Sequence, residues 1–270
     1  MAGVTDFEGF TRRTDTYDGA SHDVYQGGSG PAVIVVHEIP GLHPGVVHFA
    51  RRVVDAGFTA VMPSLFGTPG REPSGGYMAG IVARMCVARE FAFLASGRSA
   101  PVVTWLRALA ARAHENCGGP GVGAVGMCMT GGYALAMSVD DRMLAPVLSQ
   151  PASPAPFSAA RRGMIDISPT DMATVKARAA DGLCVLGLRF TNDRAVPDER
   201  FGMLRRELGD GFIAVEIDSS PGNTHGIKPS AHSVLAADLV DEEGHPTHDA
   251  LERVLDFFRE RLILRGRVAP

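Results

Sequence analysis

The sequence predicts a doubly wound α/β domain with a mostly parallel sheet and helices on both faces. Residues 32–37 are a continuous apolar, β-branched run, which is typical of a strand buried on both sides in a parallel sheet. A helical pattern over residues 46–56 and a second apolar run over residues 59–62 follow. A strand, a helix and a strand within about thirty residues indicate parallel pairing with a right-handed crossover.

The remaining elements alternate in the same way. Residues 14–30 are polar and indicate a hairpin or an edge strand, and Gly57 ends the first helix as a C-cap glycine. A loop rich in proline and glycine covers residues 63–76. Further helices are expected over residues 77–94, 101–114, 170–180, 198–208 and 248–264, and further strands over residues 122–125, 144–148, 183–189 and 212–217. Without a linker or repeat, residues 1–270 are expected to form one domain, with residues 1–30 as an N-terminal extension or edge hairpin.

The composition indicates a soluble globular enzyme. The 270 residues carry a formal net charge of −4 and 45% are hydrophobic, so we expect no nucleic-acid partner. No apolar run approaches the ~20 residues needed to span a bilayer, and the N-terminus does not resemble a secretory signal, so no membrane partner is expected. The scattered cysteines predict no metal site and no disulfide framework, hence a cytoplasmic location. They are Cys86, Cys117, Cys128 and Cys184.

The segment 121–137 carries the strongest chemical pattern. A buried strand is broken by Gly126, Cys128 follows, and Gly131 and Gly132 lead into a helical pattern. This is the layout of the nucleophile elbow G-x-S-x-G, with cysteine in place of serine. A thiolate there would be stabilised by the N-terminus of the following helix. The alternative is that Cys128 is a small buried apolar residue at a strand end.

Other reactive side chains follow other strands, and sheets of this class carry their chemistry at the carboxyl ends of strands. Glu38 follows the first run, Asp193 follows residues 183–189, and His225 and His232 follow residues 212–217. The order nucleophile, acid, histidine is that of the α/β-hydrolase triad. As alternatives, Asp193 forms an Asx turn and the histidines are solvated. A carboxylate such as Glu38 beside a buried strand is costly unless it is paired.

Several of these stretches resemble the dienelactone hydrolases (carboxymethylenebutenolidases), a cysteine-nucleophile branch of the α/β-hydrolase fold. The most discriminating match is His37-Glu38-Ile39-Pro40-Gly41, because most α/β-hydrolases have no glutamate there. The matching stretches are residues 33–41, 56–65, 126–132, 192–197 and 253–258.

The resemblance implies a role for each matching residue. Cys128 would be the nucleophile, Asp193 would orient the histidine, and Glu38 would hold the resting thiol until substrate enters. The backbone N–H groups of Ile39 and Met129 would form the oxyanion hole. The implied substrate is a small ester or lactone, with no cofactor and no metal. We expect a monomer or a small homo-oligomer.

The sequence departs from the family pattern in three places. Thr130 stands where the family has glycine. The histidine is either His225, in a His-Gly-Ile stretch, or His232, which aligns with the last helix without a gap and is favoured. Arg89 is a candidate for gripping a substrate carboxylate, although a solvated helix arginine is the alternative. The position of the family's second arginine, four residues beyond His232, is occupied by Ala236, which weakens carboxylate recognition.

Three other functions share these residues. A thioesterase or carboxylesterase would use the same triad on another leaving group. A hydrolase-fold binding protein would keep the pocket without turnover. In a redox sensor, the Cys128 thiol would respond to peroxide.

Overall fold

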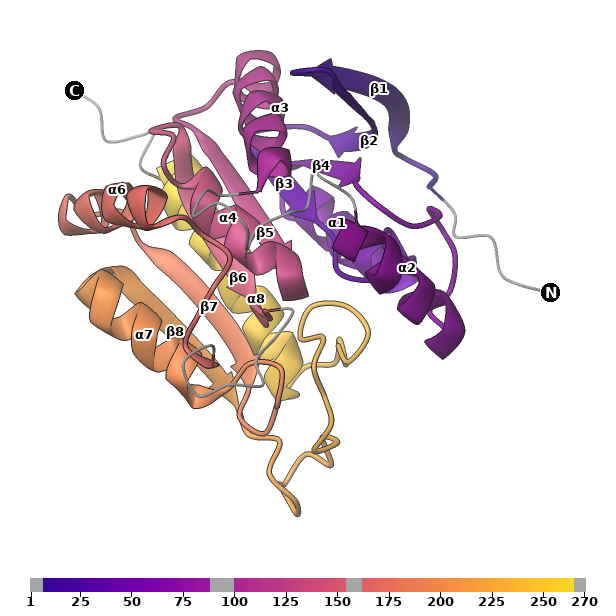
Figure 1. Ribbon diagram of the computed structural model, residues 1–270, viewed down its shortest axis with the longest axis vertical. Coiled ribbons are helices and arrows are strands. Elements are labelled where there is room, and N and C mark those ends of the chain that lie inside the picture. Colours follow the sequence, from indigo (N-terminus) through magenta and orange to yellow (C-terminus); the bar gives the residue numbers. More distant parts are fainter. Residues whose placement is uncertain (1–6, 88–99, 154–161, 265–270) are drawn as a thin grey trace.

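Eight strands form one sheet in the order β1-β2-β4-β3-β5-β6-β7-β8 in the computed structural model, which describes residues 7–87, 100–153 and 162–264. In Figure 1 the sheet crosses the molecule from β1 at the upper right to β8 at the lower left. The six strands from β4 to β8 in this order are parallel, which confirms the predicted mostly parallel α/β fold. The strands are β1 (Thr11–Tyr17), β2 (Ala20–Gly28), β3 (Ala32–Val36), β4 (Thr59–Ser64), β5 (Val122–Met127), β6 (Met143–Ser149), β7 (Val185–Phe190) and β8 (Phe212–Ile217).

The N-terminal hairpin closes one side of the sheet. β1 pairs antiparallel with β2, and β2 pairs antiparallel with β4. The outer strand β1 is largely exposed and carries charged residues, which discourages pairing with another sheet. This is the position expected for an edge hairpin.

Two hydrophobic clusters cover the two faces of the sheet. Ile34 and Val36 of β3 pack in the cluster of α3, α4, α6 and α7, whereas Val33 and Val35 pack in the cluster of α1 and α8. Side chains therefore alternate between two buried faces, as the continuous apolar runs predict. In Figure 1, α8 passes behind the strands and α4 lies in front of them. The helices are α1 (Pro44–Asp55), α2 (Gly75–Val87), α3 (Pro101–Cys117), α4 (Gly131–Met137), α6 (Pro169–Ala180), α7 (Asp198–Leu208) and α8 (Pro246–Arg259).

The observed bounds differ from the expected ones mainly at helix ends. The helix expected at 77–94 begins at Gly75, and its expected residues beyond 87 lie outside the described ranges. The helix expected at 248–264 begins two residues earlier, because His245 caps it by accepting a hydrogen bond from the backbone N–H of Thr247. Its last turn, Glu260–Leu264, is a π-helix. Within the described ranges, no helix has the length and apolar character required to cross a bilayer.

The long connection between β8 and α8, residues 218–245, is anchored by Asp241. The Asp241 carboxylate accepts hydrogen bonds from Arg52 and His48 of α1 and from His248 of α8. Burial opposes ionisation of Asp241, but these partners outweigh it and lower its pKa to about 2. The cluster holds the connection against both helices on one face of the sheet.

The Asp241→Asn substitution removes the carboxylate that these three side chains share. We expect the free energy of unfolding to fall by about 1–2 kcal/mol at neutral pH. Stability from a carboxylate with a depressed pKa is complete above its unfolded-state pKa of about 3.9. It is lost as the pH falls through the folded-state value of about 2. The difference between wild type and variant, measured by urea unfolding, should therefore shrink below about pH 4.

Asp256→Asn is the matched control, because Asp256 is an exposed residue of α8 paired with Arg259. Its effect should stay within about 0.5 kcal/mol. An Asp241→Asn difference that stays constant down to about pH 2 would contradict the assignment of the depressed pKa.

Candidate active site

The sharp turn after β5 places Cys128 at the carboxyl edge of the sheet. Cys128 has a φ of 58°, a left-handed value that is uncommon outside glycine, and it is half-buried. A short 3₁₀ turn, Cys128–Thr130, leads directly into α4. A non-glycine residue held in this region costs on the order of 1–3 kcal/mol, and such residues concentrate at functional sites. The strained strand-to-helix turn predicted for Cys128 is therefore present.

The glycines around Cys128 allow the backbone to pack closely. A Cβ on Gly126 would lie 2.1 Å from the carbonyl oxygen of Thr130, so only glycine fits there. A Cβ on Gly131 would lie 2.7 Å from the side chain of Pro151, which follows β6. A Cβ on Gly132 would meet Asp166 at the same distance. The three glycines thus fix the elbow against the neighbouring loops.

Thr130, the residue that departs from the family pattern, ties the elbow to β3. Its φ of −78° needs no glycine, and its side chain is fully buried. The hydroxyl accepts a hydrogen bond from the N–H of Met127 at 2.8 Å. Its single proton can be donated to the carbonyl of Val36, at 3.0 Å, or of Met127, at 2.9 Å. The threonine therefore adds a hydroxyl bridge between the elbow and the strand that precedes Glu38.

Asp193 and His232 meet at the same edge. The Nδ1 of His232 donates to Oδ2 of Asp193 at 2.6 Å, and the aspartate is 7% exposed. The other oxygen, Oδ1, accepts a hydrogen bond from the N–H of Ala195 at 2.8 Å, which is an Asx turn. One carboxylate thus makes both the turn and the contact with the histidine.

His232 also contacts Cys128 through its side chain. Burial disfavours the charged ring, but the charge of Cys128 and the hydrogen bond with Asp193 outweigh it and raise the pKa of His232 well above its ordinary value. The raised pKa favours the doubly protonated ring, in which Nδ1 is directed to the aspartate. A protonated imidazole beside a cysteine favours the thiolate form of the sulfur.

Glu38 lies buried at the end of β3, with 4% of its surface exposed. Its Oε1 accepts hydrogen bonds from Nε2 of His43 at 3.0 Å and from the hydroxyl of Ser233 at 2.6 Å. Its Oε2 accepts from Nε2 of Gln150 at 2.8 Å. Among the described residues, its carboxylate bonds to these three side chains and not to the sulfur of Cys128.

These bonds keep Glu38 ionised in spite of its burial. Burial raises the pKa of a carboxyl group, but the hydrogen bond from His43, followed by that from the hydroxyl of Ser233, outweighs it and holds the pKa of Glu38 below its ordinary value. Nδ1 of His43 accepts from the N–H of Gly45, which leaves the proton on Nε2 for Glu38.

Two partners of Glu38, Gln150 and Ser233, carry no signal in the sequence. Gln150 follows β6 with a φ of 37° and is fully buried, and its Oε1 accepts hydrogen bonds from Ser149 and from the N–H of Val234. Ser233 is the neighbour of His232 in the chain. Both side chains therefore connect Glu38 to the segment that carries His232.

His37 is also fixed at this edge, as a neutral ring. Its Nε2 accepts a hydrogen bond from the N–H of Leu65 and its Nδ1 donates to the carbonyl of Glu38, both at 3.0 Å. Complete burial lowers the pKa of His37 to about 4. The ring joins the end of β3 to the loop after β4.

The two backbone groups expected to form the oxyanion hole flank the site. Met129 follows Cys128 in the elbow, and Ile39 follows Glu38. Within the described residues, neither N–H donates to a turn, loop or side-chain acceptor.

His225 lies apart from these groups. Its ring is exposed and makes an edge contact with the ring of His245, with centroids 5.8 Å apart. It lines a separate hollow of about 220 Å³ together with Lys228 and the side chain of Leu239. The structure brings His232, and not His225, to Asp193.

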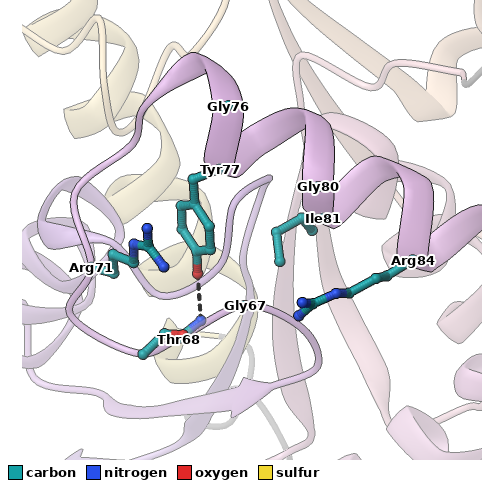
Figure 2. Close-up of a pocket in the computed structure, with 8 residues that line it drawn as sticks. All are labelled: Gly67, Thr68, Arg71, Gly76, Tyr77, Gly80, Ile81 and Arg84. Atoms are coloured by element: carbon teal, nitrogen blue, oxygen red, sulfur yellow. Dashed lines mark hydrogen bonds between the residues drawn. The ribbon is translucent and has the colours of Figure 1, made fainter.

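The predicted substrate-binding Arg89 lies outside the described residues, but two other arginines line a hollow of about 280 Å³. Figure 2 shows Arg71 beside the ring of Tyr77 and the side chain of Arg84 reaching toward Gly67. The Arg71 guanidinium lies 3.9 Å from the ring centroid of Tyr77. A Cβ on Gly67 would lie 1.9 Å from the carbonyl oxygen of Pro40, so the hollow adjoins the segment after Glu38.

The described residues contain no group of three or more histidine, cysteine, aspartate or glutamate side chains able to hold a metal ion. What the edge does contain is a thiol, an imidazole next to it and a carboxylate bonded to that imidazole. The backbone N–H groups of Met129 and Ile39 follow Cys128 and Glu38 in the chain. Such a set can carry out nucleophilic attack on a carbonyl group and stabilise the resulting oxyanion.

Comparison with known proteins gives fold relatives over nearly the whole chain. A candidate dienelactone hydrolase from Klebsiella pneumoniae has a TM-score of 0.62 at 18% identity, covering 93% of this chain and 98% of that one. Est1E from Butyrivibrio proteoclasticus has a TM-score of 0.57 at 15% identity, with 92% and 98% covered. A dienelactone hydrolase from Anabaena variabilis has a TM-score of 0.58 at 13% identity, with 94% and 98% covered. At these identities the likeness concerns the fold.

Sequence comparison identifies the family. A candidate hydrolase fragment of Escherichia coli K12, YghX, is 46% identical over 52 residues, so the match spans 44% of that relative's length and 18% of this chain. The sequence profile of the dienelactone hydrolase family matches residues 15–262. Because this match covers most of the chain, the protein belongs to the dienelactone hydrolase family and has the α/β-hydrolase fold.

Proposed function

We propose that this protein hydrolyses a small ester or lactone through an acyl-cysteine intermediate. The observation that carries the proposal is the position of His232, which contacts Cys128 and donates from Nδ1 to Asp193 at 2.6 Å. Membership of the dienelactone hydrolase family supports the same class of reaction. A nucleophile, a base within reach and a third group that orients the base are the requirements of covalent acyl transfer.

In the first half of the reaction, the Cys128 thiolate attacks the carbonyl carbon and forms a C–S bond. The electron pair of the C=O bond moves to oxygen, and the oxyanion is held by the N–H groups of Ile39 and Met129. As the C=O bond re-forms, the ester C–O bond breaks, and His232 gives its proton to the leaving alkoxide. In a lactone, the released hydroxyl remains attached to the acyl group.

In the second half, water attacks the acyl-cysteine. His232, now neutral, takes a proton from the water while the new C–O bond forms. Collapse of the second oxyanion breaks the C–S bond, releases the acid and restores the thiolate beside the protonated ring. Asp193 keeps Nδ1 as a donor throughout, so Nε2 is the nitrogen that exchanges the proton. The cycle consumes water and ester and requires no cofactor.

For Glu38 we propose a positioning role in the arrangement observed here. The resemblance implies that Glu38 holds the resting thiol, but its carboxylate bonds to His43, Ser233 and Gln150. Because Ser233 adjoins His232, the buried carboxylate anchors the segment that carries the base. A shift of Glu38 toward the sulfur would require these three bonds to break.

Rival functions differ in what they require of Cys128. A thioesterase or carboxylesterase would use the same side chains and would differ in the preferred leaving group. A binding protein would show no turnover, and a redox sensor would react with peroxide without cleaving esters. Rates on matched oxygen and sulfur esters would separate the two enzyme classes.

Replacing Cys128 with alanine removes the nucleophile, so we expect the rate of hydrolysis of an activated aryl ester to fall by about a thousandfold or more. Cys117→Ala is the control, because Cys117 is another half-buried free cysteine at the end of α3. It should retain the wild-type rate. Equal rates for wild type and Cys128→Ala would exclude the acyl-cysteine mechanism.

Alanine at His232 and alanine at His225 should have opposite outcomes. The His232→Ala variant loses the base, and we expect its kcat to fall by about a hundredfold or more. The His225→Ala variant loses an exposed ring that contacts His245, so its kcat should remain near the wild-type value. The two variants are assayed in parallel on the same ester. Full activity of His232→Ala, or equal losses in both variants, would refute the assignment of the base.

The Glu38→Gln substitution keeps the shape of the side chain but removes its charge. The buried donors of His43 and Ser233 then lose a charged acceptor, and we expect the free energy of unfolding to fall by about 1–3 kcal/mol at neutral pH. Because the pKa of Glu38 is depressed, its contribution in the wild type is complete above the unfolded-state value of about 4.3 and is lost at lower pH. Urea unfolding of both proteins at several pH values measures this.

Glu252→Gln serves as the matched control, because Glu252 makes a half-exposed ion pair with Arg52. We expect a loss of at most about 1 kcal/mol in that variant. If Glu38→Gln proves no more destabilising than Glu252→Gln, the buried carboxylate does not anchor the His232 segment.

A further inference from the structure

Arg200 of α7 is a fully buried cation beside the candidate site. Its Nε donates to the carbonyl of Met164 at 2.7 Å. Its Nη1 donates to the carbonyls of Pro151, at 2.8 Å, and Ala195, at 2.7 Å. Its Nη2 is buried without a hydrogen-bond partner among the described residues. The guanidinium is thus held by backbone carbonyls instead of a carboxylate, an unusual arrangement for a buried charge.

The two carbonyls bound by Nη1 belong to the segments that hold Cys128 and Asp193. The residue after Pro151 is Ala152, whose N–H donates to the carbonyl of Cys128 at 3.0 Å. The N–H of Ala195 itself donates to Oδ1 of Asp193 at 2.8 Å. Through Nη1, Arg200 therefore links the segment Pro151-Ala152, which bonds to Cys128, to Ala195, which bonds to Asp193.

The positive charge of Arg200 also interacts with Asp193 and Cys128. Burial lowers its pKa to about 10, opposed by the negative charges of Asp193 and Cys128. Arg200 therefore remains a cation at neutral pH. Arg200 from α7 and His232 from the segment after β8 both interact electrostatically with Cys128 and with Asp193.

We propose that Arg200 is a positioning residue for the reaction at Cys128, in which it holds Cys128 and Asp193 in register and supplies a fixed positive charge that favours the thiolate. The kinetic part of this inference rests on the proposed function. The effect of Arg200 on the Cys128 thiolate is independent of the proposed function, because alkylation of Cys128 needs no substrate.

The chain offers a matched control in Arg178 of α6. Its guanidinium also donates to backbone carbonyls, those of Ser138, Asp140, Asp141 and Met143. Met143 begins β6, so Arg178 lies at the amino end of the strand, whereas Pro151 lies beyond its carboxyl end. Losing Arg178 removes equivalent hydrogen bonds without touching the support of Cys128 or Asp193.

The experiment compares Arg200→Met, Arg200→Lys and Arg178→Met in the full chain. For each protein, kcat and KM are measured on an activated aryl ester, and the rate of Cys128 alkylation by iodoacetamide is followed against pH by mass spectrometry. Thermal unfolding is measured separately, so that rates are compared at a temperature at which every variant is folded.

We expect kcat of Arg200→Met to fall by about tenfold or more, with a smaller change in KM. The pH midpoint of Cys128 alkylation should rise by about half a unit or more, because a cation near the sulfur has been removed. Arg200→Lys keeps the charge but not the forked geometry, so its midpoint should stay near the wild-type value while kcat falls. Arg178→Met should be less stable than wild type but should keep the wild-type kcat and midpoint.

The proposal is overturned if Arg200→Met keeps the wild-type kcat and midpoint, or if Arg178→Met lowers kcat as much as Arg200→Met does. If Arg200→Met does not fold, Arg200→Lys provides the test. A wild-type kcat in Arg200→Lys would overturn the proposal that Arg200 holds Cys128 and Asp193 in their relative positions. If wild type cleaves no ester while the midpoint still rises in Arg200→Met, the proposed function fails and the effect of Arg200 on the thiolate stands.

Discussion

The left-handed turn at Cys128 is the constraint on which the other contacts of the site depend. A β-strand cannot continue through a residue with a φ of 58°, so the chain leaves the sheet at this point and presents the sulfur at its edge. The strain is tolerated because the surroundings determine the turn from several directions. Gly126 admits the carbonyl of Thr130 at close range, and the Thr130 hydroxyl bonds to the end of β3.

Next to this turn, a buried polar network sets where the histidine segment lies. The ionised Glu38 receives hydrogen bonds from Gln150 after β6 and from Ser233 in the long connection after β8. Asp238 accepts the backbone N–H groups of His232 and Ser233 at 2.9 and 3.0 Å. A buried charge with all its partners in place favours one arrangement, because each alternative leaves a polar group unpaired. The elbow and the network together position the imidazole between the sulfur and Asp193.

The sequence predicts the sheet well because local pattern and tertiary burial coincide in this fold. Runs such as residues 32–37 are apolar on both sides because both faces of β3 are covered. The site could be predicted only where a residue's neighbours in the chain carry the pattern, as the glycines do for Cys128. This kind of pattern could not reveal Gln150, Ser233 and Arg200. Gln150 and Ser233 bond to Glu38, and Arg200 bonds to Pro151, which in each case lies far away in the chain. Thr130 was visible as a departure from the family, but its bridge to β3 depends on a contact 94 positions away in sequence.

Asp193 shows why structural and functional interpretations of one residue need not compete. A carboxylate has two oxygens, and here one accepts from the N–H of Ala195 while the other accepts from Nδ1 of His232. The turn fixes the direction of the second oxygen, and a fixed acceptor determines which imidazole nitrogen keeps its proton. The structural role of Asp193 is thus a condition of the chemical role that we propose for it. The same relation holds for Cys128, because its strained backbone turn determines where its sulfur lies. For Asp193, a local pattern could not distinguish an Asx turn from a catalytic acid, because one carboxylate serves the turn and the contact with His232 together.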